Sequence, residues 1–524
     1  MALVHPASAD MKLHLIGQEE SAVQILVDAL VKKLAIPKHF SGLLFVDPDA
    51  LTEVNEFSTR DYCQEKHGEH CGMIFKQIDI YCVRLYGVFF EPPNLAAIDY
   101  AHVTGVSISQ RLAECLHSHV EDSLFRDLPM EYGIVQSKPT YLLQVPPSLT
   151  TKERIVSLLK RVPASTAPST LISPKRLRTG DRIVPAIGVS DVYLFPTAKA
   201  ALYRLHNHLT MFNDYEYISV AFGRVSKSLL DILAINGARH DHFANGDEND
   251  LTNLEALCKA EKTAEHGVQA LYVEFPSVSA FEGLRKLADR YGFVLVVSET
   301  TVNLANVDFM SIADVLATNL AAGFSGDTDV QGGSLVLNPE SSAVYRYLKP
   351  LMERNWHNEV FTGDIVELEY NSRDYLCRSA TSNQNAEAIA TFLQGKATKS
   401  SVIRVNYPKF TPGFEVYMRD PTSKFVPGYG CLVVVDFEEQ DCAVAFYAAL
   451  KMEIEAHSID CPTCIFLEDS GTLFRGDQVN SGCSVHVVAG LESTDSLIRS
   501  VQQALEVADG STGDRKVIAP SGSL

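Results

Sequence analysis

Two groups of side chains have the residue types of a metal or redox site. Cys461 and Cys464 form one CxxC pair, and without a second pair this spacing is weak evidence for zinc or redox chemistry. The second group lies within one polar segment and consists of Cys63, His67, His70 and Cys71. Four ligands so close in sequence would strain a tetrahedral zinc site, so this segment is interpreted as a polar loop. We therefore predict no metal site.

Three single side chains have the chemistry of a base, an anion contact or a carboxylate. His486 lies in the apolar run 485–488, where a histidine facing a cleft could be a general base near neutral pH; the alternative is a hydrogen-bonded histidine within a strand. Lys199 stands at an expected helix start and could meet an anion as a point charge. Glu299 is a pocket carboxylate or a cap for the next segment, and the cap is favoured.

The His-Asp-His run at 240–242 is interpreted as a solvated helix–strand connection rather than a metal site.

Length and composition set limits on the class of protein. The chain has 524 residues, which at roughly 100–200 residues per domain predicts about three domains. The formal net charge of −20 disfavours non-specific binding to nucleic acid or to anionic membranes. The sequence has no run of 18 apolar residues and no signal-peptide pattern at its N-terminus, so we expect a soluble protein of the cytoplasm.

Apolar strands alternate with helix-length segments between residues 187 and 340. The expected strands are 192–195, 217–222, 270–275, 293–297, 315–318 and 333–337. This alternation predicts an α/β fold with a mainly parallel sheet covered by helices, in which ligands bind at the carboxyl ends of the strands. We predict five regions: 1–160 as an N-terminal extension, 161–186 as a linker rich in Pro, Ser and Thr, 187–365 as the large sheet domain, 366–508 as a smaller α+β domain and 509–524 as a flexible tail.

Several short motifs occur in an order that points to one family. They are DVYLFPT at 191–197, EFPS at 274–277, FSGD at 324–327 leading into GGSLVLNP at 332–339, NSRDYL at 371–376, NQNAE at 383–387, GYG at 428–430 and AGLE at 489–492. The set resembles the cystathionine gamma-synthase-like enzymes of fungi, members of the Cys/Met-metabolism family of pyridoxal-phosphate (PLP) enzymes of fold type I. The motif HVTG at 102–105 resembles their N-terminal extension. The resemblance implies a PLP-transferase-like large domain with a smaller C-terminal domain.

That family needs a lysine that forms a Schiff base with PLP and a carboxylate that pairs with the pyridinium nitrogen. The motif alignment puts Ala322 at the lysine position and Ser298 at the carboxylate position. Alanine cannot form an imine, and a hydroxyl does not hold the ring nitrogen protonated as a carboxylate does. Glu299 is adjacent, but successive strand residues point to opposite faces of a sheet, so Glu299 is a poor substitute.

Four further contacts of the family's site are also changed. Val278 replaces an asparagine that contacts the PLP phenolic oxygen, and Ser226 replaces the tyrosine that stacks on the ring. Ala198-Lys199-Ala200 replaces the Gly-Met-Ser-like phosphate cup at a helix N-terminus. His486 replaces the arginine that binds the substrate carboxylate. Lys199 or Lys227 could in principle replace the lost lysine, but the missing partner of the ring nitrogen argues against it. Six changed contacts in a retained scaffold indicate a protein that has left PLP chemistry.

Three hypotheses about function follow. The first is an enzyme that uses no PLP and holds a small, apolar molecule in the vacated cleft, for a cyclisation, addition or condensation step of specialised metabolism. Its candidate catalytic residues are His486, Lys199 and Arg373, although Arg373 in the NSRDYL motif is favoured as structural. The second is a non-catalytic partner of an active homologue. The third is the PLP-dependent transsulfuration or gamma-substitution that the family implies. The resemblance also implies a homodimer or homotetramer.

Overall fold

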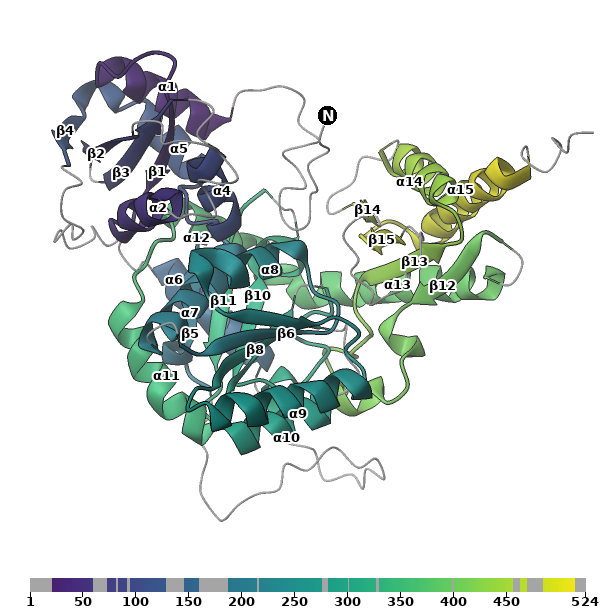
Figure 1. Cartoon of the computed structure of the whole chain (residues 1–524). Helices are drawn as coiled ribbons and strands as arrows, with labels where there is room; N and C mark the ends of the chain where they lie inside the picture. Colours follow the sequence, from purple (N-terminus) through teal and green to yellow (C-terminus); the bar gives the residue numbers. More distant parts are fainter. Residues whose placement is uncertain are drawn as a thin grey trace, which may run out of the picture.

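The computed structural model describes residues 21–59, 73–81, 83–91, 95–128, 146–159, 187–213, 216–275, 281–299, 301–326, 329–397, 400–455, 462–468 and 484–513. These residues form an N-terminal unit, a large sheet domain and a smaller C-terminal domain (Figure 1). The predicted linker at 161–186, the cysteine–histidine group at 63–71, Cys461 and Val278 lie outside the described residues.

The N-terminal unit contains a four-stranded antiparallel sheet. Its strands are β1 (Ser41–Phe45), β2 (Met73–Ile80), β3 (Val83–Phe90) and β4 (Leu124–Asp127), in the order β1-β3-β2-β4. Its helices are α1 (Ala22–Lys33), α2 (Asp49–Thr59), α4 (Leu95–Thr104) and α5 (Gln110–His117). Alternate residues of β3 enter two cores, because strand side chains alternate between faces. Leu85 and Phe89 pack with α1 and α5, whereas Tyr86 and Val88 pack in the core shared with the large domain.

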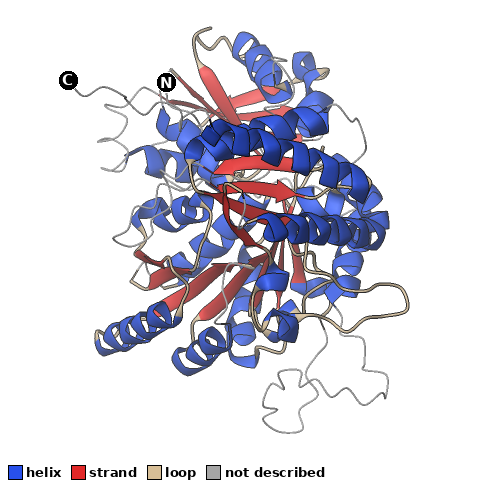
Figure 2. Ribbon diagram, turned by 90° about the vertical axis from the view of Figure 1, so that its right-hand side faces the viewer, coloured by secondary structure: helices blue, strands red, loops and turns tan. Residues whose placement is uncertain are grey.

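The large domain contains a seven-stranded sheet in the order β5-β11-β10-β9-β8-β6-β7. Its strands are β5 (Val192–Phe195), β6 (Ile218–Phe222), β7 (His240–Phe243), β8 (Val268–Glu274), β9 (Val294–Glu299), β10 (Val315–Asn319) and β11 (Gly333–Leu337). Its helices are α6 (Pro146–Leu159), α7 (Ala198–Phe212), α8 (Lys227–Ala234), α9 (Glu248–Thr263), α10 (Phe281–Tyr291), α11 (Ser342–Asn355) and α12 (Thr362–Asn371). β6 to β10 run parallel, and β11 is antiparallel to both β10 and β5. Helices lie on both faces of this sheet (Figure 2), as the alternating pattern predicted.

The C-terminal domain is an antiparallel sheet with helices packed on one face. Its strands are β12 (Val402–Asn406), β13 (Leu432–Phe437), β14 (Cys464–Glu468) and β15 (Ser484–Val488), in the order β12-β13-β15-β14. The helices are α13 (Tyr375–Lys396), α14 (Gln440–Glu455) and α15 (Thr494–Gly513). Val433 and Val435 of β13 pack with Val485 and Val487 of β15 in the core under these helices. No helix in the described part of the chain has the length and hydropathy to cross a membrane.

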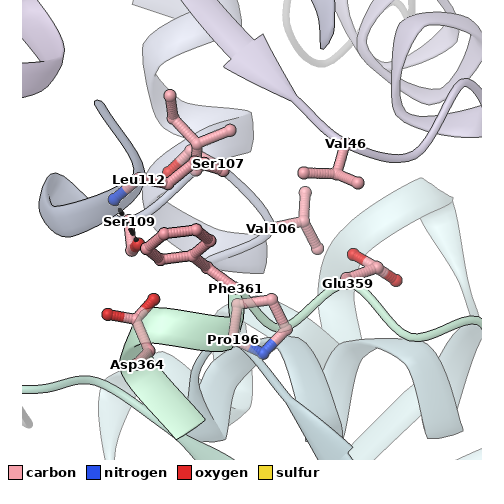
Figure 3. Close-up of a pocket in the computed structure, with 10 residues that line it drawn as sticks. Val46, Val106, Ser107, Ser109, Leu112, Pro196, Glu359, Phe361 and Asp364 are labelled. Atoms are coloured by element: carbon pink, nitrogen blue, oxygen red, sulfur yellow. Dashed lines mark hydrogen bonds between the residues drawn. The ribbon is translucent and has the colours of Figure 1, made fainter. Parts of the chain in front are cut away.

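Buried polar contacts join the three parts. Arg204 of α7 binds Asp47, Glu53 and Glu359 at 2.7, 3.1 and 3.1 Å, so one guanidinium ties the N-terminal unit to the large domain. Nearby, Phe361 lies between Asp364 and Glu359 at the same junction (Figure 3). The cavity there measures about 10 Å³, which is space for about one water molecule.

A reciprocal amide pair joins the large domain to the C-terminal domain. Asn306 donates to Asn383 of α13 at 2.9 Å, and Asn383 donates back at 3.0 Å. The backbone N–H groups of Gly428 and Gly430 add bonds to the same two amide oxygens. Both asparagines are buried, so their amide groups are satisfied within the protein.

Two of the predicted boundaries and the interpretation of residues 240–242 differ from the structure. The division at 365/366 falls inside α12, which packs against α6 and the segment after β10, so α12 lies with the large domain. Helix α15 continues to Gly513, past the predicted start of the tail at 509. The 240–242 run is an edge strand, β7, rather than a connection, because its backbone pairs with β6 while its polar side chains remain largely exposed.

Candidate functional site at the carboxyl edge of the large sheet

Glu274 and Ser298 mark the carboxyl edge of the parallel strands. They are cross-strand partners at the ends of β8 and β9. Two residues earlier in each strand, Tyr272 and Val296 lie in the core beneath α7 and α8. Because strand side chains alternate, Glu274 and Ser298 also point to the α7 side of the sheet. This is the edge at which ligands of parallel α/β sheets bind.

Glu299 points to the opposite side and caps the following segment. Its side chain is buried, and one carboxylate oxygen accepts the backbone N–H groups of Val302 and Asn303 at 3.0 and 2.7 Å. Burial raises the pKa of Glu299 to about 7, while these two hydrogen bonds act in the opposite direction. The favoured interpretation of Glu299 as a cap agrees with these contacts.

Ser226 is the N-cap of α8 and is held by Glu274. Its hydroxyl donates to one carboxylate oxygen of Glu274 at 2.6 Å, and its backbone N–H donates to the other at 2.8 Å. The same hydroxyl accepts the backbone N–H of Leu229 at 3.3 Å. The carboxylate at the end of β8 is therefore engaged by the start of α8.

Ala322 lies in a short π-helical segment, Leu320–Ser325, directly after β10. Arg378 of α13 fixes this segment by donating to the carbonyl oxygens of Gly323 and Phe324 at 3.2 and 2.8 Å. The same guanidinium donates to the carbonyl oxygen of Asn371 at 2.9 Å. One planar guanidinium thus joins two carbonyls of this segment to the carbonyl of Asn371 at the end of α12.

The start of α7 is in contact with the N-terminal unit. Thr197 caps the helix by accepting the backbone N–H of Ala200 at 2.9 Å, and its hydroxyl donates to the carbonyl oxygen of Gly105 at 3.1 Å. The ammonium of Lys199 donates to the carbonyl oxygen of His102 at 3.1 Å. Gly105 has a φ of +64°, and a Cβ there would lie 2.5 Å from the Thr197 hydroxyl. A glycine is thus required where the HVTG motif meets α7.

Two other predicted site residues, His486 and Arg373, belong to elements outside the large sheet. His486 is a half-buried residue of β15, paired in register with Val434 and Phe466, on the sheet face away from the helices. Arg373 lies on an exposed turn, where it donates to Glu369 at 2.7 Å. This ion pair favours the structural interpretation of Arg373.

The last two predictions to compare with the structure concern Lys227 and metal binding. Lys227 is exposed and pairs with Asp231 at 2.6 Å on the surface of α8. Within the described residues, no three His, Cys, Asp or Glu side chains are grouped so that they could hold a metal ion.

Two residues of this edge were not assigned from the sequence. Glu274 had a usable signal, because it is the last residue of an apolar strand and so had to lie at the carboxyl edge. Arg378 had no such signal, since its partners are backbone carbonyls 54 and 55 positions away.

Comparisons with known proteins give relatives along most of the chain, although no family model matches it. The cystathionine gamma-synthase-like enzyme iboG2 of Amanita muscaria is 31% identical over 394 residues, which cover 69% of this chain and 62% of that protein. The alanine racemase ungC of Aspergillus violaceofuscus is 28% identical over 452 residues, which cover 81% of this chain and 74% of that protein.

Among solved structures, cystathionine gamma synthase from Xanthomonas oryzae pv. oryzae, in complex with cystathionine, has a TM-score of 0.50 at 15% identity. The match covers 73% of this chain and 91% of that one. At this identity the likeness concerns the fold. The chain spans about three fifths of the length of the Amanita relative.

Proposed function

Because this chain belongs to the cystathionine gamma-synthase-like family of PLP fold type I enzymes, we propose that it uses their scaffold for a reaction that needs no PLP. The observation that supports this proposal is the motif alignment, which puts Ala322 at the position of the family's Schiff-base lysine. Ala322 lies on the segment whose carbonyl groups Arg378 binds. An alanine side chain has no nitrogen with which to form the covalent link.

The surrounding residues also fit PLP poorly. Ser298 offers a hydroxyl where the family has a carboxylate, and the neighbouring carboxylate of Glu274 is engaged by Ser226. Ser226 itself serves as a helix cap in place of a stacking tyrosine. At the expected phosphate cup, the Thr197 side chain takes up one amide of α7 and Gly105 lies against the helix start. We derive no step through PLP from this arrangement.

The proposed reaction is a cyclisation, addition or condensation of a small apolar molecule in specialised metabolism. In this proposal His486 accepts a proton, because an imidazole is a base near neutral pH. Lys199 at the start of α7 balances negative charge that develops on the substrate. The motif alignment puts His486 at the position of the family's carboxylate-binding arginine, and the loss of that arginine disfavours an amino-acid substrate. We further propose a homodimer or homotetramer that acts in the cytoplasm.

Metabolite profiling tests the catalytic assignment. A host that expresses the wild-type chain should accumulate a product that is absent from the same host with His486→Ala. His117→Ala is the matched control, because His117 is an exposed residue of α5. An unchanged product with His486→Ala removes His486 as the base. No product from any form supports the hypothesis of a non-catalytic partner subunit.

A further inference from the structure

The turn between α4 and α5 of the N-terminal unit contacts two parts of the large domain that flank the candidate site. At the start of this turn, the carbonyl oxygen of Gly105 accepts the hydroxyl of Thr197, directly before α7. At its end, Arg111 in the first turn of α5 reaches Asp329 and α12. Ser109, between these two contacts, lines the small cavity of the junction (Figure 3). One short turn therefore extends from the start of α7 to α12.

The guanidinium of Arg111 lies among three carboxylates of the large domain. One nitrogen lies 3.2 Å from a carboxylate oxygen of Asp329, and a second donates to the Asp329 carbonyl oxygen at 3.4 Å. These nitrogens also lie 3.6 Å from Asp364 and 3.8 Å from Glu367, which share one face of α12. Arg111 thus joins α12 to the connection that carries Asp329, between the Ala322 segment and β11.

Asp364 makes this cluster sensitive to the loss of its cation. The Asp364 side chain is 7% exposed. Burial raises the pKa of Asp364, whereas Ser109 and Arg111 act in the opposite direction. The charge of Asp329 adds to the rise, because like charges repel each other. Without the guanidinium, the carboxylates around it would repel one another, and Asp329 would be pushed away from α12.

Asn371 connects Asp329 to the segment that carries Ala322. The Asn371 amide donates to the second carboxylate oxygen of Asp329 at 3.1 Å and to the hydroxyl of Ser325 at 2.9 Å. Ser325 is buried and is the last residue of the π-helical segment. A displacement of Asp329 therefore removes a partner of the amide that binds the end of this segment.

We propose that Arg111 is a positioning residue through which the N-terminal unit fixes the Ala322 segment at the carboxyl edge of the large sheet. Arg111 holds Asp329 against α12, and Asn371 links that position to Ser325. Arg378 binds the same segment from α13, so the parts of the chain on both sides of the large domain hold it. This inference goes beyond the proposed function, because it concerns the shape of the site whichever reaction takes place there.

Hydrogen–deuterium exchange of the full-length protein tests the proposal, because it reports on the segment without a substrate. In Arg111→Met, the amides of 320–326 should exchange about threefold faster than in the wild type, as expected for the loss of a partly exposed ion pair. Arg111→Lys keeps the charge and should restore most of the protection. Because salt screens ion pairs, the difference between Arg111→Met and the wild type should shrink in about 1 M sodium chloride.

Asp329→Ala is an independent test of the same contact. It should also speed the exchange of residues 320–326, and the double variant with Arg111→Met should exchange about as fast as Arg111→Met alone, because both changes break one contact. Arg84→Met is the matched control. Arg84 pairs with Asp79 at 2.6 and 3.1 Å inside the N-terminal unit, and the exposed fractions of the Arg84 and Arg111 side chains are 32% and 31%. This control should leave residues 320–326 at the wild-type rate.

Two results would overturn the proposal. The first is unchanged exchange of residues 320–326 in both Arg111→Met and Asp329→Ala. The second is equal acceleration by Arg84→Met, because the segment would then respond to a general loosening of the N-terminal unit. If Arg111→Met does not fold, Asp329→Ala and its salt dependence decide alone.

Discussion

The hydroxyl of Ser226 donates to Glu274 at 2.6 Å across 48 positions of sequence, and its backbone N–H donates to the same carboxylate. This pair joins the start of α8 to the end of β8, at the carboxyl edge of the parallel strands. Ser226, which the motif alignment assigns to the family's ring-stacking tyrosine, caps α8 and binds Glu274 here.

Removal of this carboxylate should destabilise the large domain. Glu274→Ala leaves the hydroxyl and N–H of Ser226 without their partner, which should lower the free energy of unfolding by about 2 kcal/mol. Urea unfolding followed by circular dichroism measures the change. Glu282→Ala is the control, because Glu282 is exposed on α10 and should leave the unfolding curve in place. Equal curves for both variants would show that the Ser226–Glu274 pair contributes no stability.

The amide pair between the domains gives a second stability test. Asn383→Leu removes both bonds to Asn306 and the acceptor for the Gly430 N–H, so buried polar groups lose partners. We expect a loss of about 2 kcal/mol or more in the free energy of unfolding. Gln384→Ala, an exposed neighbour on α13, should have little effect in the same urea experiment. A loss as large for Gln384→Ala would contradict the role of the pair.

Stability should depend on pH through Glu299. Its pKa is raised from an ordinary 4.5 to about 7 in the folded protein, so between these values the folded state binds a proton that the unfolded state lacks. The contribution of Glu299 to the free energy of unfolding therefore falls as the pH rises from about 5 to about 7. Glu359, whose pKa burial also raises, contributes with the same sign.

Glu299→Gln isolates this contribution. In the variant, the free energy of unfolding should decline less steeply with pH, by about 1.4 kcal/mol per pH unit over that window, because one titrating proton is removed. Its amide oxygen can still accept the N–H groups of Val302 and Asn303. Urea unfolding of wild type and variant at several pH values between 5 and 7 gives the two slopes. Parallel slopes would mean that Glu299 is already ionised at pH 5.

Arg378 should hold the segment that carries Ala322. Arg378→Met removes the donors to Gly323 and Phe324, so the amides of 320–326 should exchange with deuterium faster than in the wild type. Arg373→Met is a close control, because its ion pair with Glu369 is exposed. If both variants exchange alike at this segment, the guanidinium of Arg378 does not fix it.

The sequence predicted the framework of the large domain because its strands are apolar runs. The predicted segments 192–195 and 333–337 coincide with β5 and β11. β7 was missed because it is a polar edge strand whose residues 240–242 lack the apolar pattern.

The site was predictable only in part. The sequence predicted, from strand alternation, that Ser298 and Glu299 face opposite sides of the sheet. Which side carries α7 came from the structure. The engagement of Glu274 by Ser226, and of the Ala322 segment by Arg378, depends on contacts between elements that no local pattern encodes. Val278 lies outside the described residues, so its role stays a prediction.

The most direct test of a PLP-independent scaffold is the absorption spectrum of the purified protein, followed by borohydride reduction and peptide mapping. Because the motif alignment puts Ala322 at the position of the family's lysine, we predict no visible band of lysine-bound PLP and no pyridoxyl-lysine in the map. A yellow protein in which one lysine carries the reduced cofactor in a one-to-one ratio would contradict the account.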